Sequence, residues 1–324
     1  MKKEPANKKR FLVEALCSIA ENREIEVSLL SHDWIVQLNR NGMSRFVYGY
    51  NFDLNSAAAA LIANDKCALS YVLAQHKIPH VAHELFLTPQ LLDYVGSDGN
   101  WVRAMQSVER FGYPVVCKDN QGTGGDQVLR IENQKELESA FQEIHTSKRG
   151  LALSPYYPIE AEYRMILLDG AELLCYEKQQ PYVLGNGHSS YHELIRANYS
   201  HDPEICKVAL SESSLPLNEI PKKDSKIPLM WKHNLGGGAI PCFKLDPTIQ
   251  KSVFKLSAEA CMALGIRFAC VDVIQTQGEM RVLEVNAGVM LETVSRFSEE
   301  GRSLALNVYT HAVDAMFRQE NPAG

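Results

Sequence analysis

The sequence feature that most constrains the fold is a pair of strand-like runs at residues 271–274 and 282–286. Both runs are rich in β-branched and apolar residues, and a short polar stretch separates them, which predicts a β-hairpin. We expect a five-residue turn at 275–279, with Ile274 opposite Met280. Such a hairpin commits this part of the chain to a sheet with one face turned toward the core.

Three polar side chains interrupt these runs, namely Asp272, Glu284 and Asn286. Because side chains alternate between the two faces of a strand, the predicted register places all three on one face. Three oxygen ligands, two of them anionic, suit Mg²⁺, which keeps water or phosphate oxygens as its other ligands. The alternative is that Asp272 and Glu284 are strand carboxylates that are paired or that face solvent. Unpaired charges in apolar runs would be costly, so we favour a metal site.

A second motif is Lys118 followed by the loop Gln121-Gly122-Thr123-Gly124-Gly125. Glycines with free backbone N–H groups can wrap around phosphates, although an ordinary hairpin turn has the same composition. The loop joins two strand-like runs at 114–118 and 127–131. Walker loops and dinucleotide fingerprints instead open a helix, so both are excluded. We expect a flexible glycine flap with a lysine on the strand that leads into it.

The rest of the chain alternates between strands and helices, which indicates an α/β (α+β) protein. At the N-terminal end, an amphipathic helix precedes three strands and two further helices. Strands are expected at 25–30, 34–38, 46–50, 151–154 and 163–168, and helices at 57–62, 67–76, 101–111, 133–144, 248–264 and 303–318. The dipeptide Asp169-Gly170 predicts a hairpin turn. Residues 197–227 are polar and contain three prolines, so we expect a surface insertion or mobile loop there.

Composition excludes several classes of protein. The net charge is −6 and the pI about 6.0, so nothing indicates a nucleic-acid or membrane-surface binder. No run approaches the roughly 20 apolar residues that span a bilayer. The eight cysteines are scattered without a C-x-x-C pair, which is typical of reduced thiols in a cytoplasmic protein.

Taken in order, these motifs resemble the ATP-grasp superfamily over about two-thirds of the chain. The landmarks are Asp65-Lys66, Pro114-Val115-Val116-Cys117-Lys118, the glycine loop, Glu162-Tyr163-Arg164, Asn234-Leu235-Gly236-Gly237-Gly238, Asp272 and Glu284-Val285-Asn286. Residues 178–187 and 193–195 are most similar to the amino-acid ligases of this superfamily, such as cyanophycin synthetases, bacterial glutathione-synthesising ligases and ribosomal-protein glutamate ligases.

The resemblance implies an ATP-grasp fold, in which two α+β subdomains grip ATP. We expect a small N-terminal α/β domain at residues 1–62. The subdomain that carries the glycine flap would follow at 63–155, and the subdomain that carries the metal site at 156–324. This N-terminal domain is shorter than the one that usually precedes the fold.

The resemblance also implies residues for nucleotide binding. Lys66 and Lys118 would contact the ATP phosphates, and the flap residues Gln121, Gly122, Thr123, Gly124 and Gly125 would close over them. A hinge formed by Pro155, Tyr156 and Tyr157 would hold adenine through backbone groups, and Glu162 would contact the ribose.

Catalytic roles follow from the same resemblance. Lys178 would lie near the γ-phosphate, Asn234 would border the acyl-phosphate site, and Arg164 would contact substrate or phosphate. Lys232 stands nearest to the position where the family often has arginine. Asp272, Glu284 and Asn286 would hold Mg²⁺ or Mn²⁺.

Two other departures concern the nucleotide hinge and the substrate side of the pocket. In the hinge, Ser154 or Pro155 stands where an acid is common. After the metal ligands, Ala287-Gly288-Val289 replaces the usual Pro-Gly, which affects the expected substrate pocket.

The expected function is ATP-dependent ligation of a carboxylate to an amine through an acyl phosphate, with release of ADP and phosphate. The expected substrates are a small-molecule carboxylate and a small-molecule amine, such as an amino acid or peptide. We also consider a homodimer. Phosphotransfer, ligation to a thiol, and a non-catalytic nucleotide-binding regulator are the alternatives. No cysteine, serine or histidine forms a recognisable activated triad, which favours acyl-phosphate chemistry over a protein nucleophile.

Overall fold

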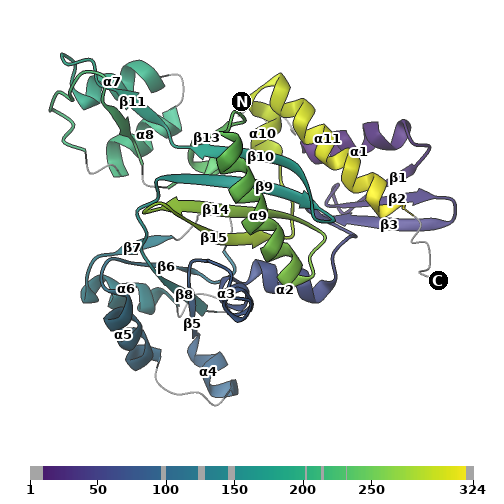
Figure 1. The fold of residues 1–324 in the computed structure, drawn as a ribbon, viewed down its shortest axis with the longest axis horizontal. Coiled ribbons are helices and arrows are strands. Elements are labelled where there is room, and N and C mark those ends of the chain that lie inside the picture. The colour runs from purple at the N-terminus through teal and green to yellow at the C-terminus, as the bar shows by residue number, and fades with distance from the viewer. Residues whose placement is uncertain are drawn as a thin grey trace, which may run out of the picture.

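A five-stranded antiparallel sheet forms the centre of the molecule (Figure 1). The computed structural model describes residues 10–95, 100–122, 128–144, 150–200, 203–212, 215–230 and 232–318. In spatial order the strands are β13 (Ile240–Cys242), β10 (Ala171–Gln179), β9 (Ala161–Leu168), β14 (Phe268–Thr276) and β15 (Glu279–Asn286). The predicted turn at Asp169-Gly170 joins β9 to β10, with both residues at positive φ, as a tight two-residue hairpin requires.

Alternation along these strands supplies two separate hydrophobic cores. On β9, Met165 and Leu167 point to one face, and Ile166 and Leu168 point to the other. The first face is covered by α9 (Pro247–Leu264), together with α2 (Ala57–Asn64) and α3 (Lys66–Gln75). The second face is covered by α11 (Glu299–Met316) and by α1 (Phe11–Glu21). Both faces of the central sheet are therefore buried over most of its length.

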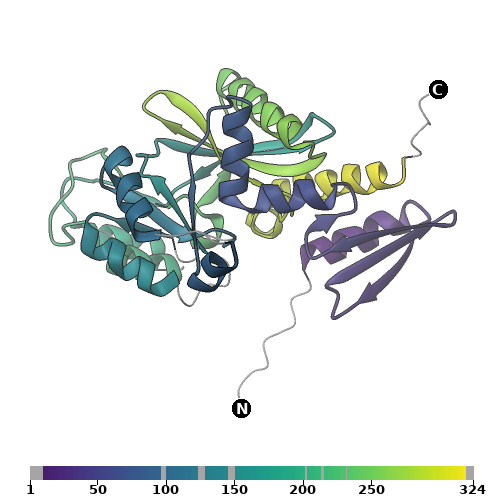
Figure 2. The same cartoon turned by 90° about the horizontal axis from the view of Figure 1, so that it is seen from below.

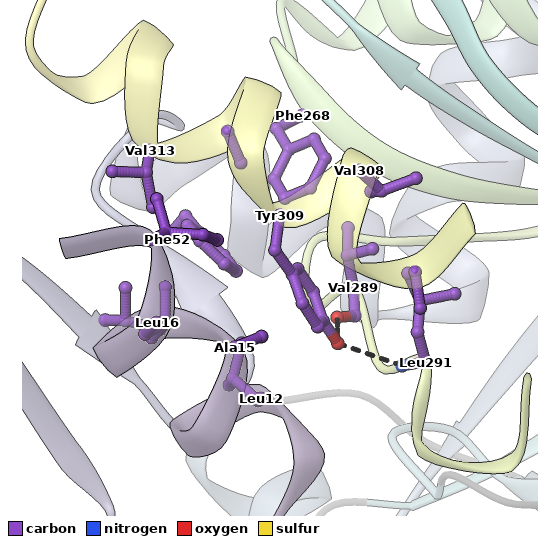
Figure 3. Close-up of a cluster of buried hydrophobic side chains, with 14 of the residues drawn as sticks. Leu12, Ala15, Leu16, Phe52, Phe268, Val289, Leu291, Val308, Tyr309 and Val313 are labelled. Atoms are coloured by element: carbon purple, nitrogen blue, oxygen red, sulfur yellow. Dashed lines mark hydrogen bonds between the residues drawn. The ribbon is translucent and has the colours of Figure 1, made fainter. Parts of the chain in front are cut away.

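Tyr309 of α11 connects this second core to the chain that follows β15 (Figure 3). Its ring packs on Phe52 at a centroid distance of 5.7 Å. Its hydroxyl donates to the carbonyl of Val289 at 3.1 Å and accepts from the amide of Leu291 at 3.1 Å. Burial raises the pKa of Tyr309 well above its usual value, so the hydroxyl stays neutral. The segment at 289–291 is thus fixed to the core by one side chain.

The N-terminal sheet is a meander of β1 (Glu26–Leu30), β2 (Ile35–Arg40), β3 (Met43–Tyr48) and β4 (Asn51–Phe52). The three predicted strands are confirmed within a few residues, and β4 is additional. Figure 2 shows this sheet in purple beside the yellow α11. Its apolar face and α1 share one hydrophobic core with α11 and the central sheet. The predicted domain boundary at residue 62 falls inside α2.

A second four-stranded sheet carries the glycine loop. Its strands, in spatial order, are β5 (Glu84–Leu87), β8 (Gly150–Pro155), β6 (Val115–Asp119) and β7 (Leu129–Ile131). The helices α4 (Pro89–Val95), α5 (Asn100–Phe111) and α6 (Gln134–Ile144) accompany it, and it has its own hydrophobic core around Phe86 and Leu137. The predicted arrangement of strand, glycine loop and strand is confirmed, because β6 leads into the loop and pairs with β7 beyond it.

Residues 182–229 form a small unit with a separate hydrophobic cluster. It contains the paired strands β11 (Tyr182–Leu184) and β12 (Lys226–Pro228) and the helices α7 (Tyr191–Tyr199) and α8 (Pro203–Glu212). Of the two alternatives expected for 197–227, a surface insertion or a mobile loop, the loop is therefore wrong for 203–212. Proline at the first position of a helix loses no hydrogen bond, so Pro203 starts this helix and does not prevent it.

The hairpin of β14 and β15 differs from its predicted register. Thr276 pairs with Glu279 around a two-residue turn at Gln277-Gly278, so the expected pairing of Ile274 with Met280 is wrong. Farther along, a β-bulge shifts the pairing by one residue and places Asp272 opposite Glu284. Without that bulge the tight turn would send Glu284 to the opposite face, because a one-residue slip inverts the alternation.

No single helix of the described residues is long and apolar enough to cross a membrane. The helices α2 and α3 meet the length and composition criteria only as a pair, and a bend of 104° separates them.

Candidate functional site

A cavity of about 690 Å³ lies where the central sheet, the second sheet and the N-terminal sheet meet. Most residues predicted from the sequence line it. These are Lys66, Lys118, Gln121, Gly122, Pro155, Tyr156, Tyr157, Glu162, Arg164, Lys178, Lys232, Asn234, Glu284 and Asn286. Asp272 does not line the cavity and lies in the sheet with 1% of its surface exposed. Thr123, Gly124 and Gly125 fall outside the described residues.

Two lysines approach the cavity at the base of the glycine loop. Asp65 caps α3 by accepting from two backbone amides, which places Lys66 in the first turn of that helix. The Lys66 ammonium donates to the carbonyl of Gly122 at 2.6 Å and to that of Asn120 at 3.3 Å. In this geometry Lys66 holds the start of the loop.

Lys118 leads into the loop from β6, as its position in the sequence predicted. Burial lowers the pKa of Lys118 to about 8, and the nearby Lys66 lowers it as well, whereas Glu284 acts in the opposite direction. A buried ammonium with a depressed pKa is stabilised by any anion that enters the cavity. An anionic ligand beside Lys118 would therefore favour its charged form.

Four charged side chains meet on one face of the central sheet, beyond the apolar residues of the second core. Arg164 of β9 lies opposite Asp272 of β14 and donates to both carboxylate oxygens at 2.7 Å. Lys178 of β10 contacts Asp272 at 2.8 Å and Glu162 at 2.5 Å. Two cations and two anions thus neutralise each other in the interior, as buried charges must.

This pairing shifts the pKa values of Asp272 and Lys178. Burial alone would raise the pKa of Asp272, but the charges of Arg164 and Lys178 outweigh it and hold that pKa well below its usual range. Burial and the nearby Arg164 act to lower the pKa of Lys178, yet Asp272 and Glu162 raise it overall. Asp272 therefore stays an anion and Lys178 a cation across the physiological pH range.

Glu284 and Asn286 are the predicted metal ligands that face the cavity. Both are half-buried, and the amide nitrogen of Asn286 donates to Glu284 at 3.1 Å. Asp272 lies opposite Glu284, but both of its oxygens accept from Arg164 and Lys178. Within the described residues no three His, Cys, Asp or Glu side chains gather as a metal site. Two carboxylates and one amide are ligands that suit Mg²⁺. Asp272 would contribute only after its ion pair with Arg164 or Lys178 opened, so the metal role stays a prediction.

The predicted hinge is the end of β8 and the residues after it. Ser154 is buried, and Pro155, Tyr156 and Tyr157 follow it along the cavity. The Tyr156 amide donates to Pro114, and the guanidinium of Arg130 lies 4.2 Å from the centre of the Tyr156 ring. Glu162, expected at the ribose, contacts Lys178 in this structure.

The segment 232–236 forms another wall of the cavity. Lys232 and Asn234 line it, and Asn234 precedes the short helix η1 (Leu235–Gly237). Between them, His233 is buried, and its Nδ1 lies 3.1 Å from the carbonyl of Lys178. That contact ties the segment to β10 and to the charged network.

From the sequence we expected the small N-terminal domain and the 185–240 region to shape the substrate pocket, but no residue of the N-terminal sheet was named as part of it. Trp34, Tyr48, Tyr50 and Asn51 line the cavity, and Gly288 and Met290 lie beside them. An alternating strand pattern gives no indication that its turn reaches a distant site. One sequence signal pointed to Gly288, namely the replacement of the family's usual Pro-Gly after Asn286, which indicated that the substrate pocket departs from the family pattern.

Comparisons with known proteins connect this geometry to a group of ligases. No protein-family model matches the chain. Cyanophycin synthetase from Nostoc sp. (strain PCC 7120) is 24% identical over 299 residues, covering 86% of this chain and 31% of that protein. The chain therefore spans about a third of the length of this curated relative.

Solved structures identify the fold. A bifunctional glutathione synthetase from Pasteurella multocida superposes with a TM-score of 0.55 at 18% identity, covering 94% of this chain and 44% of that one. D-alanine–D-alanine ligase from Bacillus anthracis gives 0.51 at 16% identity, covering 82% and 70%, and its complex with ATP gives 0.50. The chain therefore shares the fold of these structures, which confirms the ATP-grasp fold predicted from its motifs.

The charged network generates a prediction about stability. Asp272→Asn removes the anion that pairs with Arg164 and Lys178 and leaves two buried cations short of a partner. We expect a loss of about 3 kcal/mol in the free energy of unfolding. The measurement is urea denaturation at neutral pH without nucleotide. Asp314→Asn is the control, because its pair with Arg23 is about one-third exposed and should contribute at most about 1 kcal/mol. Equal losses for both variants would contradict the network.

Proposed function

We propose that this chain is an ATP-dependent carboxylate–amine ligase that forms an amide bond through an acyl phosphate. The observation that carries the proposal is the convergence of two buried lysines, Glu284 and Asn286 on one cavity beside the glycine loop. The matched ligases, one of them solved with ATP, support the assignment of this cavity to ATP. The activity of this chain is a proposal, because the chain spans only part of the length of its curated relatives.

On this proposal ATP lies along the second sheet. The triphosphate contacts Lys118 and the start of the glycine loop, and adenine lies beside Ser154 and the residues that follow it. Lys66 keeps the loop in place through Gly122 and adds positive charge. Backbone N–H groups and buried ammonium groups suit phosphate oxygens, because both donate hydrogen bonds to an anionic acceptor.

The chemistry requires a weak electrophile to be activated. One carboxylate oxygen of the acid substrate attacks the γ-phosphorus, and ADP leaves. The amine then attacks the carbonyl carbon, phosphate leaves with that oxygen, and the amine loses a proton. Arg164 and Lys178 line the cavity, and they stabilise the negative charge that develops on the transferred group. A divalent cation held by Glu284 and Asn286 would neutralise the charge on the phosphates.

The compartment proposed is the cytoplasm. None of the eight cysteines, all of which lie in the described residues, forms a disulfide, and five of them are buried. Burial raises the pKa of Cys67, Cys117, Cys175, Cys261 and Cys270 to about 12. Such thiols are inert in packing roles, which agrees with a reducing environment and argues against a cysteine nucleophile.

A first prediction concerns the pH dependence of ATP binding. The pKa of Lys118 in the free protein is about 8, and bound phosphate favours the charged ammonium. ATP affinity should therefore be highest below pH 8 and should fall as the pH rises through 8, by up to tenfold per pH unit. Lys118→Met should weaken ATP binding about 10- to 100-fold at pH 7 and remove this dependence.

Isothermal calorimetry from pH 7 to 9.5 measures both effects. Lys135→Met is the matched control, because Lys135 is exposed on α6 outside the cavity. Unchanged ATP affinity in the Lys118→Met protein would place the triphosphate elsewhere.

A second prediction tests the reaction class. With Mg-ATP, release of ADP and phosphate should require both an acid and an amine from a panel of amino acids and small peptides. Glu284→Gln should reduce turnover by at least 100-fold, because it removes a charge that holds the cation. Glu279→Gln is the control, since that carboxylate is exposed at the hairpin turn.

Several outcomes would contradict the ligase assignment. Turnover with a thiol but with no amine would favour thiol ligation. Phosphorylation of a substrate without any requirement for a second substrate would favour phosphotransfer. ATP binding without turnover across the whole panel would favour the regulatory alternative.

A further inference from the structure

We propose that an aromatic wall on the N-terminal sheet binds the side chain of one ligase substrate, and that this side chain is aromatic or large and apolar. The wall consists of Trp34, Tyr48 and Tyr50. The inference rests on the proposed function and adds to it a class of substrate. It concerns the part of the cavity that the nucleotide and metal residues do not occupy.

The first observation is exposed apolar surface inside the cavity. Trp34, Tyr48, Leu61 and Met290 are 44%, 59%, 63% and 48% exposed, and all four line the cavity. Large apolar side chains left open to solvent at one concave place are costly, because each loses the free energy that burial would give. A ligand with apolar surface would recover that free energy.

The second observation is that the wall is held rigidly while it stays exposed. The guanidinium of Arg10 lies 4.7 Å from the centre of the Trp34 ring and 5.4 Å from that of Tyr50. Arg10 also donates to the carbonyls of Gly49, at 3.0 Å, and of Asp33. The orientation of the rings is therefore set before any ligand arrives, which lowers the entropic cost of binding.

Gly49 shows how closely the indole is packed. Its φ of +60° lies in the left-handed region, and a Cβ added there would stand 3.1 Å from Trp34 Cζ2. The Trp34 ring also meets Tyr48 and Tyr50 edge to face, at centroid distances of 6.3 and 6.5 Å. Such T-shaped contacts are favourable and fix the orientation of the three rings relative to one another.

The third observation is that the wall adjoins the reacting end of the cavity. Asn51 forms a β-bridge with Gly288, and the Val289 amide donates to the backbone carbonyl of Tyr50 at 3.1 Å. Gly288 is two residues beyond Asn286, one of the proposed metal ligands. A substrate whose reacting group lies near Asn286 therefore has the wall within reach of its side chain.

Charge defines the class of side chain that the wall accepts. The described residues that line this end are Trp34, Tyr48, Gly49, Tyr50, Asn51, Gly288, Met290, Thr293 and Val294, and none of them is charged. Arg10 already occupies the faces of Trp34 and Tyr50 as a cation. A cationic side chain would meet that positive charge. An anionic side chain would lose hydration, and the guanidinium of Arg10 is already engaged by two backbone carbonyls and by the two rings. Aromatic and large apolar side chains avoid both costs.

The test compares phenylalanine and glycine derivatives in which one reacting group is blocked. N-acetylphenylalanine can serve only as the acid, and phenylalanine amide only as the amine. Calorimetry with Mg²⁺ and a non-hydrolysable ATP analogue should show at least tenfold tighter binding of one phenylalanine derivative than of its glycine counterpart. The arm that shows selectivity identifies the substrate that uses the wall.

Variants locate the selectivity. Trp34→Ala and Tyr48→Ala should each weaken binding of that phenylalanine derivative about tenfold without changing the affinity for the ATP analogue. Phe46→Ala is the matched control, because Phe46 is equally exposed on β3 but lies outside the cavity, and its affinities should equal those of the wild type.

Three results would overturn the proposal. The first is equal or absent binding of phenylalanine and glycine derivatives in both arms. The second is tighter binding of the lysine derivative than of the phenylalanine derivative in the arm that shows selectivity. The third is wild-type affinity in both Trp34→Ala and Tyr48→Ala. Failure of the ligase function is distinguishable from these. In that case the aromatic selectivity appears in calorimetry, but the matched substrates release no ADP.

Discussion

Four paired charges on one face of the central sheet, three of them buried and that of Arg164 partly exposed, are the constraint on which the site depends. Arg164, Lys178, Glu162 and Asp272 come from three neighbouring strands, and each satisfies another across the sheet. An unpaired charge at any of these positions would cost several kcal/mol. Strands β10, β9 and β14 must therefore keep one relative register. That register is also the one that continues the apolar core beside α11, so packing and charge pairing specify the same sheet.

The cavity is built where this sheet face meets two other parts of the chain. A single bulge in β15 turns Glu284 toward Asp272 and the cavity. Tyr309 then holds the segment that follows, through Val289 and Leu291 (Figure 3). The turn of the N-terminal sheet docks on that same segment. One helix of the core thus positions both the proposed metal ligands and the proposed substrate wall of the cavity.

The local elements of the fold followed from sequence patterns, because alternation, capping and turn residues act over a few positions. The strands around Lys118 and the turn at Asp169-Gly170 are examples. The bulge in β15 was not predictable, because the hydrophobic pattern is compatible with either register. The helix at 203–212 was missed because prolines were taken as breaks, whereas Pro203 starts the helix. The aromatic wall depends on contacts between residues some 240 positions apart, which no local pattern encodes.

The central claim is that the cavity activates a carboxylate by phosphorylation. Oxygen transfer tests it most directly, because phosphorylation and displacement move one carboxylate oxygen into the released phosphate. With an ¹⁸O-labelled acid substrate, Mg-ATP and the amine, the account predicts one ¹⁸O atom in each phosphate and ADP as the nucleotide product. Label in AMP, or unlabelled phosphate formed together with amide product, would contradict it.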